Sequence, residues 1–504
     1  MTPGNSDDAT RTAGTERPAR LLPTLGLFST VMVVVGGVIG SGIFRKSGVM
    51  AEQVGSPGLL LAVWLLAGVI TLFGALTNAE ISGIIPETGG QYVYFERMYG
   101  PFVAFLYGWA AFVVIQTGSV AALAYVFAEY STQFFALPEL SQAAASWSFH
   151  LPFIGDIAPF KEIGVKGLAV LVVVVLTIIN YVGVRFGEVV QNICSIAKLV
   201  GMAALLVVAF LPVAGGSAGN FAASSTAVPK SGLALAAAIA VALQGAFWAY
   251  DGWVKVSFIG GEVRDSERVV PRATALGMFI VTAIYLAMNV AYCWVLPANA
   301  MAGSKLVAAD TAERIFSGGG KWIAVLVMLS TFGANNAVIL TSARVYFSMG
   351  QRHVVPSGLG SVHPRFHTPG AALAAQCLWA IVLILSGTFD TLTDTLIFVA
   401  WIFYAAGAFG VFVLRRKEAS TPRPYQVPGY PFVPAAFVVF AAVFLVLTIY
   451  NDVANYRAAV AAGRPALINS ALGLALVLVG TPIYFLCRKR QSLMRPPSMA
   501  DGGG

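Results

Sequence analysis

The sequence predicts an all-α polytopic membrane protein, and three observations support this fold class. The chain of 504 residues is 58% hydrophobic and 11% charged, with a mean hydropathy of +0.78. A soluble domain usually carries about a quarter charged residues, so this chain has too little polar surface for a water-soluble protein. Long apolar stretches recur along it, and a membrane span needs roughly 20 such residues. The composition argues against a disordered chain, a disulfide scaffold and a nucleic-acid-binding protein.

Twelve apolar stretches have the length of a membrane-spanning helix. In chain order they are 23–51, 57–85, 101–134, 167–183, 189–213, 233–259, 271–295, 322–349, 370–388, 394–414, 432–450 and 465–487. The polar segment 1–22 contains three acidic residues, which a secretory signal lacks, so we take 23–51 as the first span.

The distribution of basic residues predicts the orientation. With the N-terminus inside, 19 of the 31 Lys and Arg fall in inner segments and 10 in outer ones, while Lys198 and Lys255 lie in or beside spans. This excess places both termini in the cytoplasm. We expect cytoplasmic tails at 1–22 and 488–504, five-helix repeats at 23–215 and 233–414, and two further spans within 432–487.

The first span carries a glycine cluster at its centre. Gly36, Gly37, Gly40 and Gly42 lie within seven residues, and each weakens a helix by about 1 kcal/mol relative to alanine. Gly36 and Gly40 also fit a GxxxG helix-packing face. The extension to Gly42, with Ser41 inside the cluster, favours an interrupted helix.

The sixth span has a corresponding disturbance, where Asp251 and Gly252 follow an aromatic run. An aspartate at this depth is tolerable beside a wet cavity. Paired broken helices in corresponding positions indicate a midplane substrate site in inverted-repeat transporters. The half-helix after Gly42 would offer N–H groups to a carboxylate, and carbonyls at 247–250 would accept from an ammonium group.

Several motifs resemble a known family. The sequences IGSGIF at 39–44 and PETGGQYVY at 86–94 are similar to signatures of the amino acid–polyamine–organocation (APC) superfamily. Five further stretches resemble its L-type amino acid transporter branch, which contains the light chains of heteromeric transporters and their bacterial relatives. These stretches lie at 179–185, 197–199, 248–253, 342–346 and 423–428.

The resemblance implies a LeuT/APC-type fold with a five-plus-five inverted repeat, two C-terminal helices and broken first and sixth helices. It also implies transport by alternating access. The implied carboxylate site comprises Ile39, Gly40, Ser41 and Gly42, and the implied ammonium site comprises carbonyls near Phe247 and Ala249. Trp248 matches an aromatic that closes over the substrate, although packing between helices is the alternative role.

Lys198 lies about nine residues into the fifth span, roughly 13 Å deep at 1.5 Å per residue. A buried ammonium group must find oxygens, and carbonyls at the first-helix break are candidate partners. In the resembling branch a lysine here replaces a sodium ion, so we expect sodium-independent transport. A bracing role and coupling to a proton are the alternatives.

Asp251 bears on specificity, because branch members with an aspartate here handle cationic as well as neutral amino acids. Lys255, four residues later, could instead pair with Asp251 and neutralise it. Glu262 follows the sixth span, either as an inner gate contact to an arginine or as a solvated helix end. Glu80 and Glu129, at the ends of spans two and three, are expected at the membrane interfaces.

No metal or cofactor is expected. The four cysteines stand singly, and prolines beside His363 and His367 argue against a helix that presents both to a metal. Residues 131–166 lack the cysteine by which animal light chains bond a heavy subunit. We therefore expect a self-sufficient transporter in a bacterial inner membrane, whose partners are L-amino acids and the lipid bilayer.

The predicted function is sodium-independent exchange of L-amino acids, either neutral ones alone, with Asp251 paired to Lys255, or neutral and cationic ones, with Asp251 free for the substrate. A proton-coupled uniporter or symporter is the alternative, followed by a polyamine carrier and a non-transporting amino acid sensor. An enzyme is disfavoured because no nucleophile–base pair or metal cluster falls at membrane depth. A channel is disfavoured because no repeated ring of pore-lining charges is visible.

Overall fold

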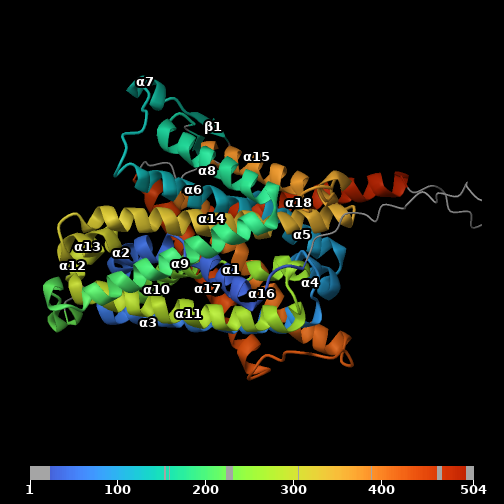
Figure 1. Ribbon diagram of the computed structural model, residues 1–504, viewed down its shortest axis with the longest axis horizontal. Helices are drawn as coiled ribbons and strands as arrows, with labels where there is room; N and C mark the ends of the chain where they lie inside the picture. Colours follow the sequence, from blue (N-terminus) through green and yellow to red (C-terminus); the bar gives the residue numbers. More distant parts are fainter. Residues whose placement is uncertain are drawn as a thin grey trace, which may run out of the picture.

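The computed structural model is a bundle of long helices that run roughly side by side (Figure 1). It describes residues 23–151, 155–157, 159–222, 231–304, 306–386, 389–462 and 468–494. The predicted tail 1–22 lies outside the described residues, as does most of 488–504. Within the described ranges, eleven helical segments are long and apolar enough to cross a membrane. The predicted ninth span corresponds to the shorter α15, with 17 residues.

The long helices follow the predicted spans with shifted ends. They are α3 (Pro57–Ile84), α8 (Ile163–Val182), α9 (Val184–Ala209), α11 (Ser266–Val295), α14 (Gly319–Gln351), α15 (Gly370–Ser386), α16 (Phe389–Lys417), α17 (Phe432–Ala461) and α18 (Asn469–Met494). The third span consists of α5 (Pro101–Ala110), a π-helical turn η1 (Ala111–Ile115) and α6 (Gln116–Ser131). Such π-helical turns occur frequently at functional sites.

The first and sixth spans are interrupted. The first comprises α1 (Leu27–Val38) and α2 (Gly42–Val54), and the sixth comprises α10 (Gly232–Tyr250) followed by the 3₁₀ segment η4 (Lys255–Glu262). α10 packs along α2, and α1 packs against α11 and α14. The two interruptions therefore lie deep inside the bundle, where neighbouring helices can satisfy the freed backbone groups.

Shorter elements lie at the two ends of the bundle. They are α4 (Gln91–Tyr99), α7 (Gln142–Ala145), β1 (Phe149–Leu151), β2 (Gly155–Ile157), η2 (Pro212–Ala214), η3 (Ala218–Phe221), α12 (Ala298–Ala302), α13 (Val307–Ile315) and η5 (Ser357–Gly360). In Figure 1, α4 and the end of α18 lie at one end, which we call the inner end, and α12 and α13 lie at the opposite, outer end. The strands β1 and β2 pair antiparallel.

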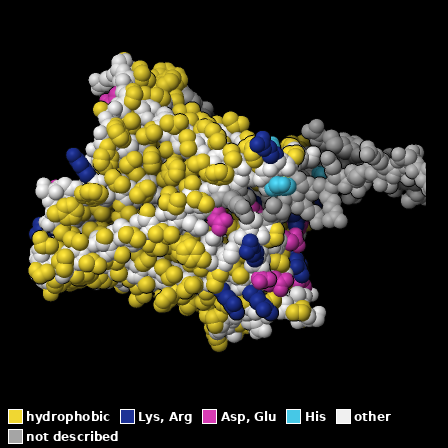
Figure 2. All heavy atoms as spheres, in the orientation of Figure 1, with side chains coloured by type: hydrophobic (Ala, Val, Ile, Leu, Met, Phe, Trp, Pro, Cys, Tyr) yellow, Lys and Arg dark blue, Asp and Glu magenta, His cyan; other side chains and the backbone are white. Residues whose placement is uncertain are grey.

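The surface of the bundle matches a membrane environment. Figure 2 shows hydrophobic side chains over most of the visible face, whereas many of the charged side chains gather toward the inner end. Many exposed residues are large and apolar, including Phe186, Val200, Trp322 and Leu378. The chain is therefore an integral membrane protein.

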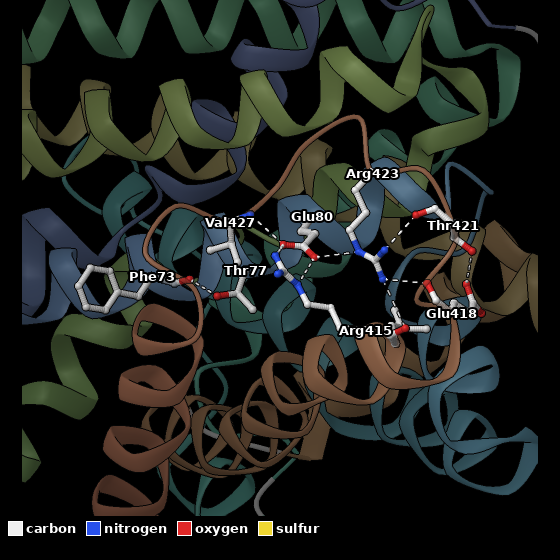
Figure 3. Close-up of polar contacts among 9 residues, drawn as sticks. Phe73, Thr77, Glu80, Arg415, Glu418, Thr421, Arg423 and Val427 are labelled. Atoms are coloured by element: carbon white, nitrogen blue, oxygen red, sulfur yellow. Dashed lines mark hydrogen bonds and ion pairs between the residues drawn. The ribbon is translucent and has the colours of Figure 1, made fainter.

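Glu80, which is expected at a membrane interface, lies near the end of α3 and is buried inside the protein. Glu80 is only 1% exposed to solvent. Arg415 donates two hydrogen bonds of 2.9 and 2.8 Å to its carboxylate, and the Val427 N–H donates one of 2.8 Å (Figure 3). The Arg423 guanidinium lies 3.4 Å away. Distant segments thus converge on Glu80, which local sequence cannot show.

We call residues 418–431, which join α16 to α17, the inner strap. Glu80 on α3 holds it through Arg423 and Val427 (Figure 3). Burial, together with the nearby Glu80 carboxylate, raises the pKa of Tyr425 in the strap to about 12, so its phenol stays neutral at physiological pH. The strap therefore fixes α3 and α16 together at the inner end.

Candidate functional site

The α1–α2 break brings the start of α2 against the end of α10. A Cβ added at Gly42 would overlap the Cα and Cβ atoms of Ala249. Only glycine therefore permits this approach. The first N–H groups of α2 have no partner within their own helix, and they carry the positive end of its dipole.

The end of α10 also requires a glycine. Asp251 is extended, with φ −63° and ψ 145°, and Gly252 has φ +121°. A Cβ at Gly252 would lie 2.8 Å from the Gly37 carbonyl oxygen. The chain can therefore turn out of α10 beside α1, which places the Asp251 side chain at the break.

A small cavity lies where the two breaks meet. It holds about 270 Å³ of space between atoms, of which about 20 Å³ admits the centre of a water molecule. Its lining comprises Gly37, Val38, Gly40, Ser41, Gly42, Ser119, Leu123, Trp248, Asp251 and Lys255. The space that water can occupy is therefore smaller than an amino acid, which would enter only with movement of the walls.

Five predicted site residues meet in this lining, namely Gly40, Ser41, Gly42, Trp248 and Asp251. The other three predicted substrate-binding residues lie behind it. The Ile39 carbonyl accepts from Lys198, the Phe247 ring packs on Trp401 with centroids 4.0 Å apart, and the Ala249 carbonyl accepts from Tyr285. Each of these three therefore supports the walls of the cavity.

Ser41 is the clearest sign of a ligand position. Its residue is 1% exposed, and its hydroxyl oxygen has no hydrogen-bond partner within the described chain. A buried hydroxyl without a partner is costly. Because Ser41 lines the cavity beside the N-terminus of α2, a bound carboxylate could accept its hydrogen bond together with those of the backbone N–H groups.

Asp251 is paired inside the protein. Lys255 Nζ donates to its Oδ2 at 2.9 Å, and the Tyr404 hydroxyl donates to its Oδ1 at 2.6 Å. The side chains of Lys255 and Asp251 are 3% and 5% exposed. Of the two arrangements that the sequence allows, the structure therefore has the i,i+4 ion pair, and it adds Tyr404 from α16.

Lys198 on α9 is fully buried and reaches the α1–α2 break. Its Nζ donates to the carbonyl oxygens of Gly36 at 3.0 Å, Ile39 at 2.6 Å and Ser330 at 3.1 Å. Ser330 Oγ also donates to the Ile39 carbonyl at 3.0 Å. The ammonium group is therefore held by two carbonyl oxygens at the break, those of Gly36 and Ile39, and by one carbonyl oxygen of α14.

Four residues of the site were not identified from the sequence, namely Val38, Ser119, Leu123 and Tyr404. Ser119 and Leu123 follow the π-helical turn in the third span, and Tyr404 comes from the tenth. The polar residues Gln116, Thr117 and Ser119 inside an apolar span were the available signal. Tyr404 gave none.

Ion pairs tie the helices together on both sides of the cavity. Toward the inner end, Arg344 on α14 makes two hydrogen bonds to Glu262, of 2.7 and 2.9 Å, and both residues are buried. Glu262 is thus an inner contact and not a solvated helix end. Toward the outer end, Arg45 on α2 pairs with Glu129 on α6 at 2.5 Å.

Metal-ligating side chains do not gather in the part of the chain that the structure describes, because no group of three or more His, Cys, Asp or Glu could hold an ion there. The four cysteines are free thiols.

Comparison with known proteins extends this picture. A family model described as amino acid permease matches residues 25–477. The chain is 32% identical to the serine/threonine exchanger SteT of Bacillus subtilis over 472 residues, which cover 93% of this chain and 97% of that protein.

Human transporters are similar as well. The chain is 32% identical to human b(0,+)-type amino acid transporter 1 over 423 residues, covering 84% of this chain and 82% of that protein. It is 31% identical to the human large neutral amino acids transporter small subunit 2 over 490 residues, which cover 96% of this chain and 84% of that protein. These relatives are transporters and not enzymes. The chain therefore belongs to the amino acid permease family of the APC superfamily.

Proposed function

We propose that this protein is a sodium-independent secondary transporter of L-amino acids that works by exchange through alternating access. Binding is assigned to the cavity between the two breaks, with the substrate carboxylate at Ser41 and the α2 N-terminus. The unpartnered Ser41 hydroxyl supports this position. The relatives named above, one of them a serine/threonine exchanger, support amino acids as the substrates and exchange as the mode.

The position of Lys198 is the observation that supports sodium-independent transport. Its ammonium group is held by three carbonyl oxygens of α1, the break and α14. Carbonyl oxygens are the ligands that an alkali cation would use at a helix break. Lys198 thus supplies a fixed positive charge at a position where a sodium-coupled protein would need an ion.

The proposal includes the repeat organisation and the orientation. Residues 23–215 and 233–414 would form the two inverted repeats, 432–487 would add two helices, and both termini would lie in the cytoplasm of a bacterium. The corresponding interruptions of the first and sixth spans support the repeat assignment. Trp248 would close over the substrate, because it lines the cavity and is only 7% exposed.

The test is uptake of labelled alanine into proteoliposomes, empty or preloaded with unlabelled amino acid, with and without sodium. We expect uptake that requires preloading and is indifferent to sodium. Uptake into empty vesicles driven by an inward proton gradient would replace exchange with proton coupling, for which protonation of Lys198 is the candidate step. A requirement for sodium would refute the assignment of Lys198.

A lysine substitution tests the same assignment directly. Lys198→Met removes the donor from three buried carbonyls, so we expect transport to fall at least tenfold in every buffer. Lys321→Met changes an exposed lysine at the start of α14 and serves as the matched control. Equal transport by both variants, each folded by size-exclusion chromatography, would show that Lys198 has no such role.

A further inference from the structure

The Lys255 side chain lies at the position that a cationic substrate would need. We propose that Lys255 is a built-in counter-ion which closes the site to cationic amino acids and selects short neutral side chains with an acceptor oxygen. This inference rests on the proposed amino acid site. It names the substrate class of that site and a residue that determines it.

The first step is the occupancy of Asp251. Each of its carboxylate oxygens already has a strong partner, Lys255 Nζ on one and the Tyr404 hydroxyl on the other. An arginine or lysine side chain that entered the cavity would have to displace a tethered ammonium group. It would also meet that ammonium group as a like charge in a buried site, where screening by water is weak.

The second step is the hydrogen-bonding capacity of the ammonium group. The Lys255 ammonium group has three N–H donors. Among the described side chains, its hydrogen-bond acceptor is Asp251. Lys255 lines the cavity, so donors remain for a bound side chain. A hydroxyl or amide oxygen of the substrate can accept them, whereas a methyl group cannot.

The third step is the size of the site. Leu123 and Trp248 form apolar walls, while Ser119 adds a hydroxyl group to the same lining. These residues share the lining with Lys255, so a side chain of a few atoms bound between the breaks can reach its ammonium group. Serine, threonine and asparagine combine short length with an acceptor oxygen, so they form the expected class.

The experiment compares wild type with Lys255→Met in proteoliposomes, using labelled serine, alanine and arginine. Wild type should take up serine in preference to alanine by about fivefold or more and leave arginine at background. In Lys255→Met, Asp251 loses its counter-ion, so arginine uptake should rise at least tenfold and the preference for serine should disappear. Lys255→Arg retains the cation and should stay closed to arginine.

A double variant and a binding measurement keep the test decisive. Lys255→Met with Asp251→Asn removes both charges, so it should gain no arginine uptake. Arginine should raise the melting temperature of detergent-solubilised Lys255→Met by several degrees and leave that of wild type unchanged, even if the variant transports slowly.

The outcomes separate the two proposals. If wild type transports none of the three amino acids, the proposed function fails. If wild type transports serine and arginine equally well, or if Lys255→Met binds no arginine and keeps the preference for serine, the role of Lys255 is overturned while the proposed function stands.

Discussion

At the scale of single residues, the site depends on the absence of a side chain at position 42. Gly42→Ala would place a methyl group into Ala249, and such overpacking costs roughly 1–3 kcal/mol. We expect a lower melting temperature and a loss of transport of tenfold or more, because the α2 N-terminus would move from the cavity. Thermal unfolding in detergent and serine uptake measure both effects.

Gly245 provides the matched control for that substitution. Gly245 lies on α10, where this helix packs against α2. A Cβ added there would come no closer than 3.4 Å to Met50 Cγ, which is an ordinary contact. Alanine also favours a helix over glycine by about 1 kcal/mol. Gly245→Ala should therefore retain stability and transport. Equal damage from both substitutions would show that close approach at Gly42 is not the cause.

At the scale of elements, the inner strap is held by one carboxylate. Glu80→Gln would leave Arg415 and Arg423 without their shared charge partner. Breaking a buried ion pair costs about 3–5 kcal/mol, and the partial exposure of Arg415 lowers our expectation to roughly 2–3 kcal/mol. The drop should appear as a lower melting temperature. In addition, proteolysis within 418–431 should become faster.

Glu87→Gln is the comparison for the strap. Glu87 pairs with Arg352, but its side chain is 58% exposed, and exposed pairs contribute about 1 kcal/mol or less. This variant should therefore unfold close to wild type. A Glu80→Gln protein that matched Glu87→Gln in stability would mean that the strap is held by packing and not by charge.

At the scale of the whole molecule, we expect the proposed opening of the site toward the inner end to separate the Glu262–Arg344 pair. This pair joins η4 to α14 beneath the cavity. Glu262→Gln weakens the contact, so we expect faster hydrogen–deuterium exchange in 24–44 and 255–270. Exchange in 432–461, on α17, should stay unchanged and serves as the internal reference. Unchanged exchange in all three segments would exclude this pair as the inner closure.

Sequence reasoning succeeded where the signal is local. The glycine cluster predicted the first interruption, Asp251-Gly252 predicted the second, and the depth of Lys198 in its span predicted burial on backbone carbonyls. It did not show the partners of Glu80, because these arginines lie more than 300 positions away in the chain. It left Asp251 undecided, because helical spacing allows a pair with Lys255 but does not require one.

The sequence by itself determined the membrane class, the approximate spans and the two breaks, because composition, hydropathy and glycine placement act over a few residues. The family followed from the resemblance of several short motifs. Only the tertiary structure decided which of the predicted residues face a common cavity. It placed Gly40–Gly42, Trp248 and Asp251 in the lining and Ile39, Phe247 and Ala249 behind it. It also joined Tyr404 to Asp251. The physical reason is that packing of helices distant in the chain sets these contacts, and no local pattern encodes them.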